Sequence, residues 1–86
     1  MDIRFKKGFT KSYKKLSQQE QTKVDVTLAV FRKDPFQSSL RNHELKGKLA
    51  GKRSISAGHD LRIIYSEEDE HAIVYLLKTG AHNQVY

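Results

Sequence analysis

The feature that most constrains the fold of this chain is an unbroken apolar run at residues 72–77, Ala-Ile-Val-Tyr-Leu-Leu. A strand that is apolar on both faces must be covered on both faces, so it belongs in the interior of a sheet. The chain has 86 residues, which is enough for one compact hydrophobic core. We therefore predict a single domain, residues 1–86, that is built around this strand.

The apolar run forms the last of four predicted strands. The other three show the alternation of apolar and polar side chains that is typical of half-buried strands. A Gly-His pair at residues 58–59 and an acidic run at residues 67–70 are predicted to be hairpin turns. The predicted strands are residues 2–9, 52–57, 61–65 and 72–78.

Two helices are predicted between the first and second strands. Apolar side chains at helical spacing over residues 9–16 indicate a short first helix. Residues 17–20, Ser-Gln-Gln-Glu, match a capping box, in which the serine and glutamate side chains bind each other's free backbone N–H groups. The second helix follows with an apolar face over residues 24–31, and an Asp-Pro pair at residues 34–35 ends it.

This order of elements, β-α-α-β-β-β, predicts an α+β fold, in which a small antiparallel sheet has a helix hairpin packed on one face. Residues 36–51 contain two glycines and have no clear periodicity, so we expect a long basic loop there. Long loops in compact domains are often functional. The opposite face of the sheet is left free to form a cleft.

The charge of the chain points to a polyanionic partner. The formal net charge is +6, and residues 41–62 carry six cations against two carboxylates. A basic surface of this kind attracts nucleic acid, although a merely well-solvated surface is the alternative explanation. The chain has no cysteine and no apolar run long enough to cross a bilayer, so we expect a cytoplasmic protein without a membrane partner.

The sequence has no spacing typical of a metal site, no phosphate-binding glycine loop and no nucleophilic serine or cysteine motif, so we predict neither a metal nor another cofactor. It does have histidines close to cations. Cleavage of RNA by its own 2′-hydroxyl needs a base, cations for the charge on phosphorus and an acid for the leaving oxygen. Histidine suits both proton roles near neutral pH, and arginine matches phosphate oxygens.

The candidate catalytic residues lie in three separate segments. They are His43, Asp60, Arg62, His82 and Tyr86, and Tyr86 is expected to stack on a base. Each has an alternative structural role. His43 could pack against the sheet edge, Asp60 could cap a turn and Tyr86 could fix the end of the chain. Arg62 could form an internal ion pair with Glu44 or Asp60.

Other cations near these residues are expected to contact the RNA backbone and to set affinity rather than specificity. They are Lys46, Lys48, Lys52, Arg53 and Lys78. The two remaining histidines, His59 and His71, are predicted to be solvated residues beside turns.

Four stretches of the chain carry a family resemblance: residues 43–47 (HELKG), 51–55 (GKRSI), 60–65 (DLRIIY) and 78–86 (KTGAHNQVY). They resemble the RelE/ParE superfamily of type II toxins, and within it the YafQ branch of the RelE-type mRNA interferases. The resemblance extends over nearly the whole chain and is most specific in its C-terminal half. One position departs from the YafQ pattern, because Ser56 stands where that branch has a further histidine.

The resemblance implies a RelE-like fold and a ribosome-dependent endoribonuclease that cuts mRNA in the A site of the 30S subunit without a metal. It also implies a cognate antitoxin that binds the toxin in a hetero-oligomer. In the YafQ branch the active site includes residues that correspond to His43, Asp60 and His82, with Tyr86 as the stacking aromatic. Arg62 stands where other RelE-type members have a catalytic arginine. Serine cannot exchange a proton near neutral pH, so the role of the missing histidine is absent or is taken by His59 or Arg62.

Two other functions remain open on the sequence alone. A ParE-like poison of DNA gyrase shares the fold but lacks the convergent histidines. A degenerate module that binds RNA or ribosomes without cleavage is compatible with the serine at position 56.

Overall fold

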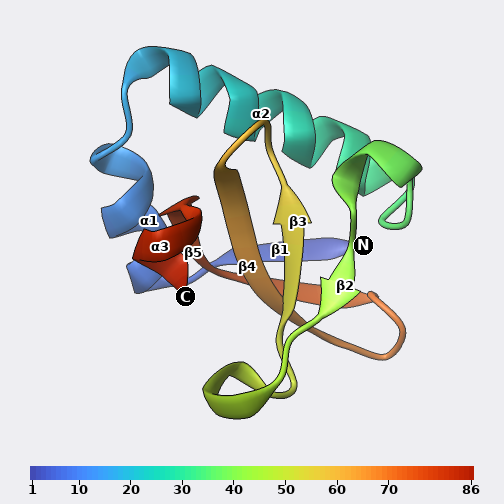
Figure 1. The fold of residues 1–86 in the computed structure, drawn as a ribbon. Coiled ribbons are helices and arrows are strands. Elements are labelled where there is room, and N and C mark those ends of the chain that lie inside the picture. The colour runs from blue at the N-terminus through green and yellow to red at the C-terminus, as the bar shows by residue number, and fades with distance from the viewer.

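The computed structural model describes residues 1–86 and consists of one sheet and three α-helices (Figure 1). The five strands form this sheet in the order β1-β5-β4-β3-β2. The predicted α+β fold with a helix hairpin is therefore confirmed. In chain order the elements are β1 (Asp2–Phe5), α1 (Lys7–Lys14), α2 (Gln18–Lys33), the 3₁₀ turn η1 (Ser38–Leu40), β2 (His43–Glu44), the 3₁₀ turn η2 (Gly47–Leu49), β3 (Arg53–Ser56), β4 (Leu61–Glu68), β5 (Ile73–Ala81) and α3 (His82–Val85).

The apolar run lies where its composition requires, since β5 is paired on both sides. It runs antiparallel to β4, but parallel to β1, with Ile3 opposite Val74. The prediction of a wholly antiparallel sheet was therefore wrong. Almost all other elements lie between β1 and β5 in the sequence. Parallel strands need a long connection, and this one is long enough. The alternation of side chains along a strand carries no information on its direction.

The predicted loop at residues 36–51 contains a fifth strand. In β2, His43 pairs with Ser54 and Glu44 pairs with Arg53. Two residues are too few to show an alternating pattern. The acidic run also differs from the prediction, because Glu67 and Glu68 extend β4 and the turn lies at residues 69–72.

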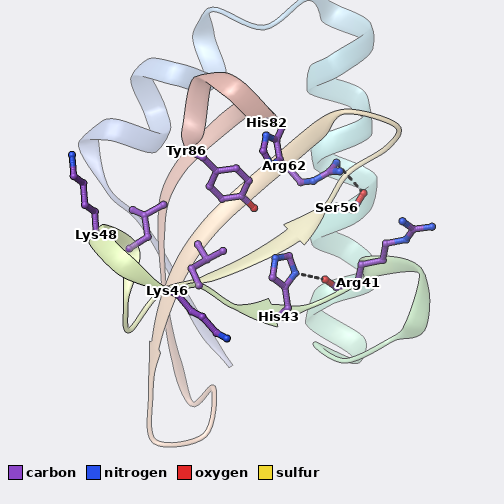
Figure 2. A pocket seen from close by; sticks show the side chains of 10 residues that line it. Arg41, His43, Lys46, Lys48, Ser56, Arg62, His82 and Tyr86 are labelled. Atoms are coloured by element: carbon purple, nitrogen blue, oxygen red, sulfur yellow. Dashed lines mark hydrogen bonds between the residues drawn. The ribbon is translucent and has the colours of Figure 1, made fainter.

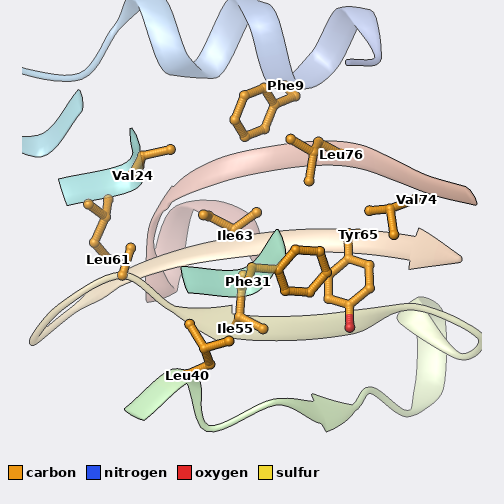
Figure 3. Packing of buried hydrophobic residues seen from close by; sticks show 11 residues of the cluster. Phe9, Val24, Phe31, Leu40, Ile55, Leu61, Ile63, Tyr65, Val74 and Leu76 are labelled. Carbon is orange, nitrogen blue, oxygen red and sulfur yellow. The ribbon is translucent and has the colours of Figure 1, made fainter. Parts of the chain in front are cut away.

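Helix α2 covers one face of the sheet and begins at the predicted capping box. The hydroxyl of Ser17 accepts from the backbone N–H of Glu20 at 3.2 Å, and the Glu20 carboxylate accepts from that of Ser17 at 2.9 Å. Phe31 on this helix is fully buried and meets the ring of Tyr65 edge-on, with 4.9 Å between the ring centroids. The core cluster lies around this contact (Figure 3). Its members on the sheet include Ile55, Leu61, Ile63, Tyr65, Val74 and Leu76.

The other face of the sheet carries polar side chains. Ile55 and Ile63 are paired and belong to the core, so their strand neighbours Ser56 and Arg62, which are also paired, point away from it. Helix α3 folds back beside this face, and its Val85 is buried. The loop that contains η2 extends away from α2 (Figure 1). None of the helices is long and apolar enough to span a membrane.

Candidate active site

A groove of about 730 Å³ lies on the polar face of the sheet (Figure 2). Its walls come from the β2 region, the loop around η2, the β3–β4 pair and α3. Its lining has no Asp or Glu side chain, and it includes four cations, Arg41, Lys46, Lys48 and Arg62. Uncompensated positive charge in a concave surface attracts and concentrates anionic ligands.

His43 and His82 both line this groove, although they are far apart in the sequence. His43 is exposed on β2, and its Nδ1 lies 2.9 Å from the carbonyl oxygen of Arg41. A carbonyl can only accept a hydrogen bond, so Nδ1 must carry a proton. In the neutral ring this leaves the lone pair on Nε2, where it can accept a proton from a ligand.

Arg62 projects from β4 into the groove and is held only by neutral oxygens. Its Nη1 donates to the carbonyls of Leu61 at 3.0 Å and Gly58 at 3.3 Å, and to the hydroxyl of Ser56 at 3.4 Å. Ser56 in turn donates to the Gly58 carbonyl at 2.8 Å. The internal ion pair considered for Arg62 is not present. Its charge therefore remains available to a ligand, and Ser56 helps to orient it.

The turn from β5 into α3 brings His82 and Tyr86 to the same groove. Gly80 has a φ of +157° at this turn. The side chain of Gln84 accepts from the backbone N–H of Ala81 at 2.9 Å. His82 and Tyr86 lie one helical turn apart, and their rings meet edge-on with 4.3 Å between centroids. The hydroxyl of Tyr86 donates to that of buried Ser54, which fixes the ring against the sheet.

Several predicted site residues lie outside the groove. Asp60 lines a different depression, together with His59 and Lys23. Only the backbone of Asp60 serves the site, because its carbonyl accepts from the N–H of His82 at 3.0 Å. Asp60 stands before the first residue of β4, where the turn rather than strand alternation sets the direction of the side chain.

Three predicted RNA-binding cations are also elsewhere. Lys52 and Arg53 line a depression that contains two carboxylates. Arg53 forms an ion pair with Glu44 at 3.3 Å and lies 5.3 Å from the centre of the Phe36 ring. Lys78 lies beside α1 and α3. Of the five predicted cations, Lys46 and Lys48 line the groove.

Three residues of the groove, Arg41, Leu45 and Leu49, were not among the predicted site residues. Arg41 was considered only as one of the cations of the basic loop. Leu45 and Leu49 are apolar residues in an otherwise basic segment, and this pattern could have indicated that they form an apolar part of the groove lining. His71 was predicted to be solvated, and this was wrong. Its side chain is only 10 % exposed, and its Nε2 lies 2.7 Å from the Tyr65 hydroxyl. No group of three histidine, aspartate or glutamate side chains is placed to hold a metal ion.

The groove thus combines an imidazole with a free Nε2, a second imidazole, a guanidinium without a carboxylate partner and an exposed aromatic ring. This set can bind a phosphodiester, transfer protons on it and stack on a neighbouring base.

Comparisons with known proteins agree with this architecture. The profile of a family described as "Bacterial toxin of type II toxin-antitoxin system, YafQ" matches residues 1–86. A search of curated protein sequences found no significant match. The crystal structure of YafQ from Escherichia coli strain BL21(DE3) is similar, with a TM-score of 0.81 at 21% identity, over 99% of this chain and 97% of that one.

Two complexes of known structure contain similar chains. One is the toxin–antitoxin complex RelBE2 from Mycobacterium tuberculosis, with a TM-score of 0.75 at 22% identity, over 94% of this chain and 90% of that one. The other is the DinJ–YafQ complex from E. coli, with a TM-score of 0.70 at 22% identity, over 99% of this chain and 97% of that one. At these identities the structures show a shared fold, and the profile match over the whole chain shows the family. The chain belongs to the YafQ family of bacterial toxins from type II toxin–antitoxin systems.

Proposed function

We propose that this toxin is an endoribonuclease that cleaves mRNA in the ribosomal A site and thereby inhibits translation. The observation that carries the proposal is the meeting of His43, Arg62 and His82 in one groove whose lining has cations and no Asp or Glu side chain. RNA supplies its own nucleophile, the 2′-hydroxyl, so the protein needs only proton transfer and charge stabilisation. Family membership supports the same activity.

In the proposed reaction His43 is the general base. Its Nε2 accepts the proton of the 2′-hydroxyl, whose oxygen then attacks the adjacent phosphorus. The bond from phosphorus to the 5′ oxygen breaks, which leaves a 2′,3′-cyclic phosphate on one product. The bond from Nδ1 to the Arg41 carbonyl favours this assignment, because it leaves Nε2 free to accept a proton.

Arg62 and His82 act on the phosphate and the leaving group. The guanidinium of Arg62 binds the non-bridging oxygens, on which negative charge grows in the transition state. His82, in its protonated form, gives a proton to the 5′ oxygen as it leaves. Ser56 orients Arg62 through its hydroxyl and exchanges no proton.

The remaining groove residues bind the message. Lys46 and Lys48 lie where they can contact backbone phosphates. Tyr86 is 44% exposed and held by Ser54, so its ring offers a fixed surface for stacking on a base. Tyr86 thus positions the substrate rather than transferring a proton.

We also infer that a cognate antitoxin protein binds and neutralises this toxin in a hetero-oligomer. Similar chains are found in the RelBE2 toxin–antitoxin complex and in the DinJ–YafQ complex. The ribosome and its mRNA are the proposed targets when the antitoxin is absent.

Mapping of cut sites by primer extension tests the proposal. One message is prepared in a translated form and in a form without a start codon, and each is exposed to purified toxin with ribosomes. We expect cuts in register with the reading frame on the translated copy alone. His43→Gln and His82→Gln should each lower the cleavage rate by about 10²–10⁴-fold, the usual contribution of one acid or base.

His59→Gln is the matched control, because His59 lies outside the groove and its side chain makes no hydrogen bond. This variant should cleave like the wild type. Wild-type toxin that leaves both messages intact, or His43→Gln and His82→Gln variants that cleave at the wild-type rate, would contradict the proposal.

A further inference from the structure

A chain of hydrogen-bonded side chains lies beside the groove and has no part in the reaction above. It links Arg53 on β3, Asn42 before β2, Tyr65 on β4 and His71 in the β4–β5 turn. Arg53 Nε donates to Asn42 Oδ1 at 2.8 Å, and Asn42 Nδ2 donates to the Tyr65 hydroxyl at 2.7 Å. The Tyr65 hydroxyl lies 2.7 Å from Nε2 of His71. The rest of the Tyr65 ring is in the core.

The side chain of Asn42 has a third partner, which fixes its orientation. Nδ2 also donates to the carbonyl oxygen of Pro35 at 2.8 Å. Arg53 Nε can only donate and the Pro35 carbonyl can only accept, so the amide of Asn42 fits in one orientation alone. Its three partners lie on β3, on β4 and in the segment after α2. Asn42 therefore ties the start of β2 to three separate parts of the fold.

The direction of the hydrogen bonds follows from this orientation. Because Asn42 donates to the Tyr65 hydroxyl, the hydroxyl proton is free to be donated to Nε2 of His71. Burial raises the pKa of Tyr65, so the hydroxyl keeps its proton. Burial lowers the pKa of His71, which favours the neutral imidazole that can accept. Each of the three links, Arg53 to Asn42, Asn42 to Tyr65 and Tyr65 to His71, then joins a donor to an acceptor.

The backbone next to Asn42 carries the hydrogen bond that sets the tautomer of His43. Arg41 has a φ of +49°, in the left-handed region, and its carbonyl is the one that accepts from His43 Nδ1. A non-glycine residue in this region costs about 1–2 kcal/mol and persists only where neighbouring contacts enforce it. Strand β2 has only two residues, so backbone pairing alone gives little support.

We propose that Asn42 is a positioning residue for His43. Held by Tyr65, Arg53 and Pro35, it keeps the Arg41 carbonyl against Nδ1 and thereby leaves Nε2 free toward the groove. The catalytic consequence rests on the proposed function, whereas the effect on the tautomer of His43 does not.

Two variants and one matched control test this. Asn42→Ala removes the anchor, and Tyr65→Phe removes one hydroxyl from it while the buried ring remains. Tyr13→Phe is the control, because it also deletes one tyrosine hydroxyl, which binds Asp25 at 2.8 Å in the helix hairpin far from β2. The tautomer of His43 is read from its ¹⁵N imidazole shifts at a pH where the ring is neutral. Single-turnover cleavage is measured beside the affinity for an RNA whose 2′-hydroxyl at the cut site is replaced by hydrogen.

We expect the Nδ1–H tautomer in the wild type and in Tyr13→Phe, and a mixture of tautomers in both test variants. Their cleavage rates should fall by about 10–10²-fold, as for a misplaced catalytic group, with the affinity for the uncleavable RNA unchanged. If Asn42→Ala does not fold, Tyr65→Phe decides.

Folded variants that keep the Nδ1–H tautomer and the wild-type rate overturn the proposal. If the wild type cleaves no RNA, the proposed function fails, and the ¹⁵N shifts alone then decide the role of Asn42. Retention of the Nδ1–H tautomer in both variants overturns that role whether or not RNA is cleaved.

Discussion

Two arginines on neighbouring strands have opposite surroundings, although both lie in the same basic part of the sequence. Arg53 pairs with Glu44, binds Asn42 and lies over the ring of Phe36. Arg62 binds only neutral oxygens of Ser56, Gly58 and Leu61. The charge of Arg53 is therefore used within the fold, and the charge of Arg62 remains for a ligand. Strand alternation separates them, because it places Arg53 on the side of Ile55 and Arg62 on the side of Ser56.

His71 makes the stability of the protein depend on pH. Burial lowers its pKa in the folded state, and Arg53 lowers it further, although Glu67 acts in the opposite direction. In the unfolded chain the pKa is about 6.5. As the pH falls below this value, His71 becomes protonated in the unfolded chain while it is still neutral in the folded protein. The free energy of unfolding therefore decreases. Neutral His71 therefore makes its full contribution to stability above a pH of about 6.5. This contribution is lost as the pH falls toward the pKa that His71 has in the folded protein.

We therefore expect the free energy of unfolding to decrease between pH 7 and pH 5, and the decrease to be smaller in His71→Gln. Urea unfolding at several pH values measures this. His59→Gln removes an exposed histidine whose side chain makes no hydrogen bond, and it should leave the decrease as in the wild type. An equal decrease in His71→Gln and in the wild type would show that another group is responsible.

At the scale of elements, the groove residues His82 and Tyr86 begin and directly follow the four-residue helix α3, and the turn before this helix is tightly packed. A Cβ at Gly80 would lie 2.9 Å from the side-chain oxygen of Gln84, which caps the turn. The φ of Gly80, +157°, is also unfavourable for other residues. We expect Gly80→Ala to destabilise the protein by about 1–3 kcal/mol and to displace His82 and Tyr86.

The displacement should lower the cleavage rate by about 10²-fold. Urea unfolding and single-turnover cleavage measure the two effects. Gly51→Ala is the control, because Gly51 also has a positive φ, +86°, but a Cβ there meets no atom within 4 Å. Gly51→Ala should lower the free energy of unfolding by about 1 kcal/mol, because of the strained φ. It should cleave normally, because Gly51 lies outside the groove. Normal cleavage by Gly80→Ala would mean that α3 is not needed in its present position.

The elements that could be predicted from the sequence are those whose own pattern is long enough to determine them. The capping box at Ser17 fixed the start of α2, and the apolar run fixed β5 as an interior strand. Strand β2 and helix α3 could not be predicted, because two and four residues carry no readable period. The parallel pairing of β1 with β5 depends on the path of the chain between the two strands, and no local sequence pattern determines that path.

At the scale of the whole molecule, the +6 charge is unevenly placed. The groove lining has lysine and arginine but no Asp or Glu side chain, whereas Lys52 and Arg53 line a depression together with Glu44 and Glu67. Distance along the sequence could not separate these cations, because Lys48 and Lys52 are close in the loop but their side chains line different depressions. The site could therefore be predicted as a set of residue types. Which residues belong to the site depends on the direction of each side chain, and only the structure gives that direction. Asp60, which lies outside the groove, and Arg41, which lines it, are examples.

This uneven placement predicts which lysines govern the salt dependence of RNA binding. Each phosphate contact to single-stranded RNA contributes about 0.7 to the slope of log K against log salt. The double variant Lys46→Gln/Lys48→Gln should therefore flatten the slope by about 1.4. Titration of an uncleavable single-stranded RNA over a range of salt concentrations measures it. The control Lys52→Gln/Lys78→Gln removes the same charge outside the groove and should keep the wild-type slope. Equal slopes for the two double variants would contradict this assignment of the RNA path.

The parallel pairing of β1 with β5 also has a consequence for the time at which the sheet and its groove are completed. During synthesis, residues 2–5 emerge early but have no strand partner until residues 73–81 have been made. His82 and Tyr86 come later still. A growing chain therefore holds an unpaired first strand, and its groove lacks one wall until residues 82–86 have been made.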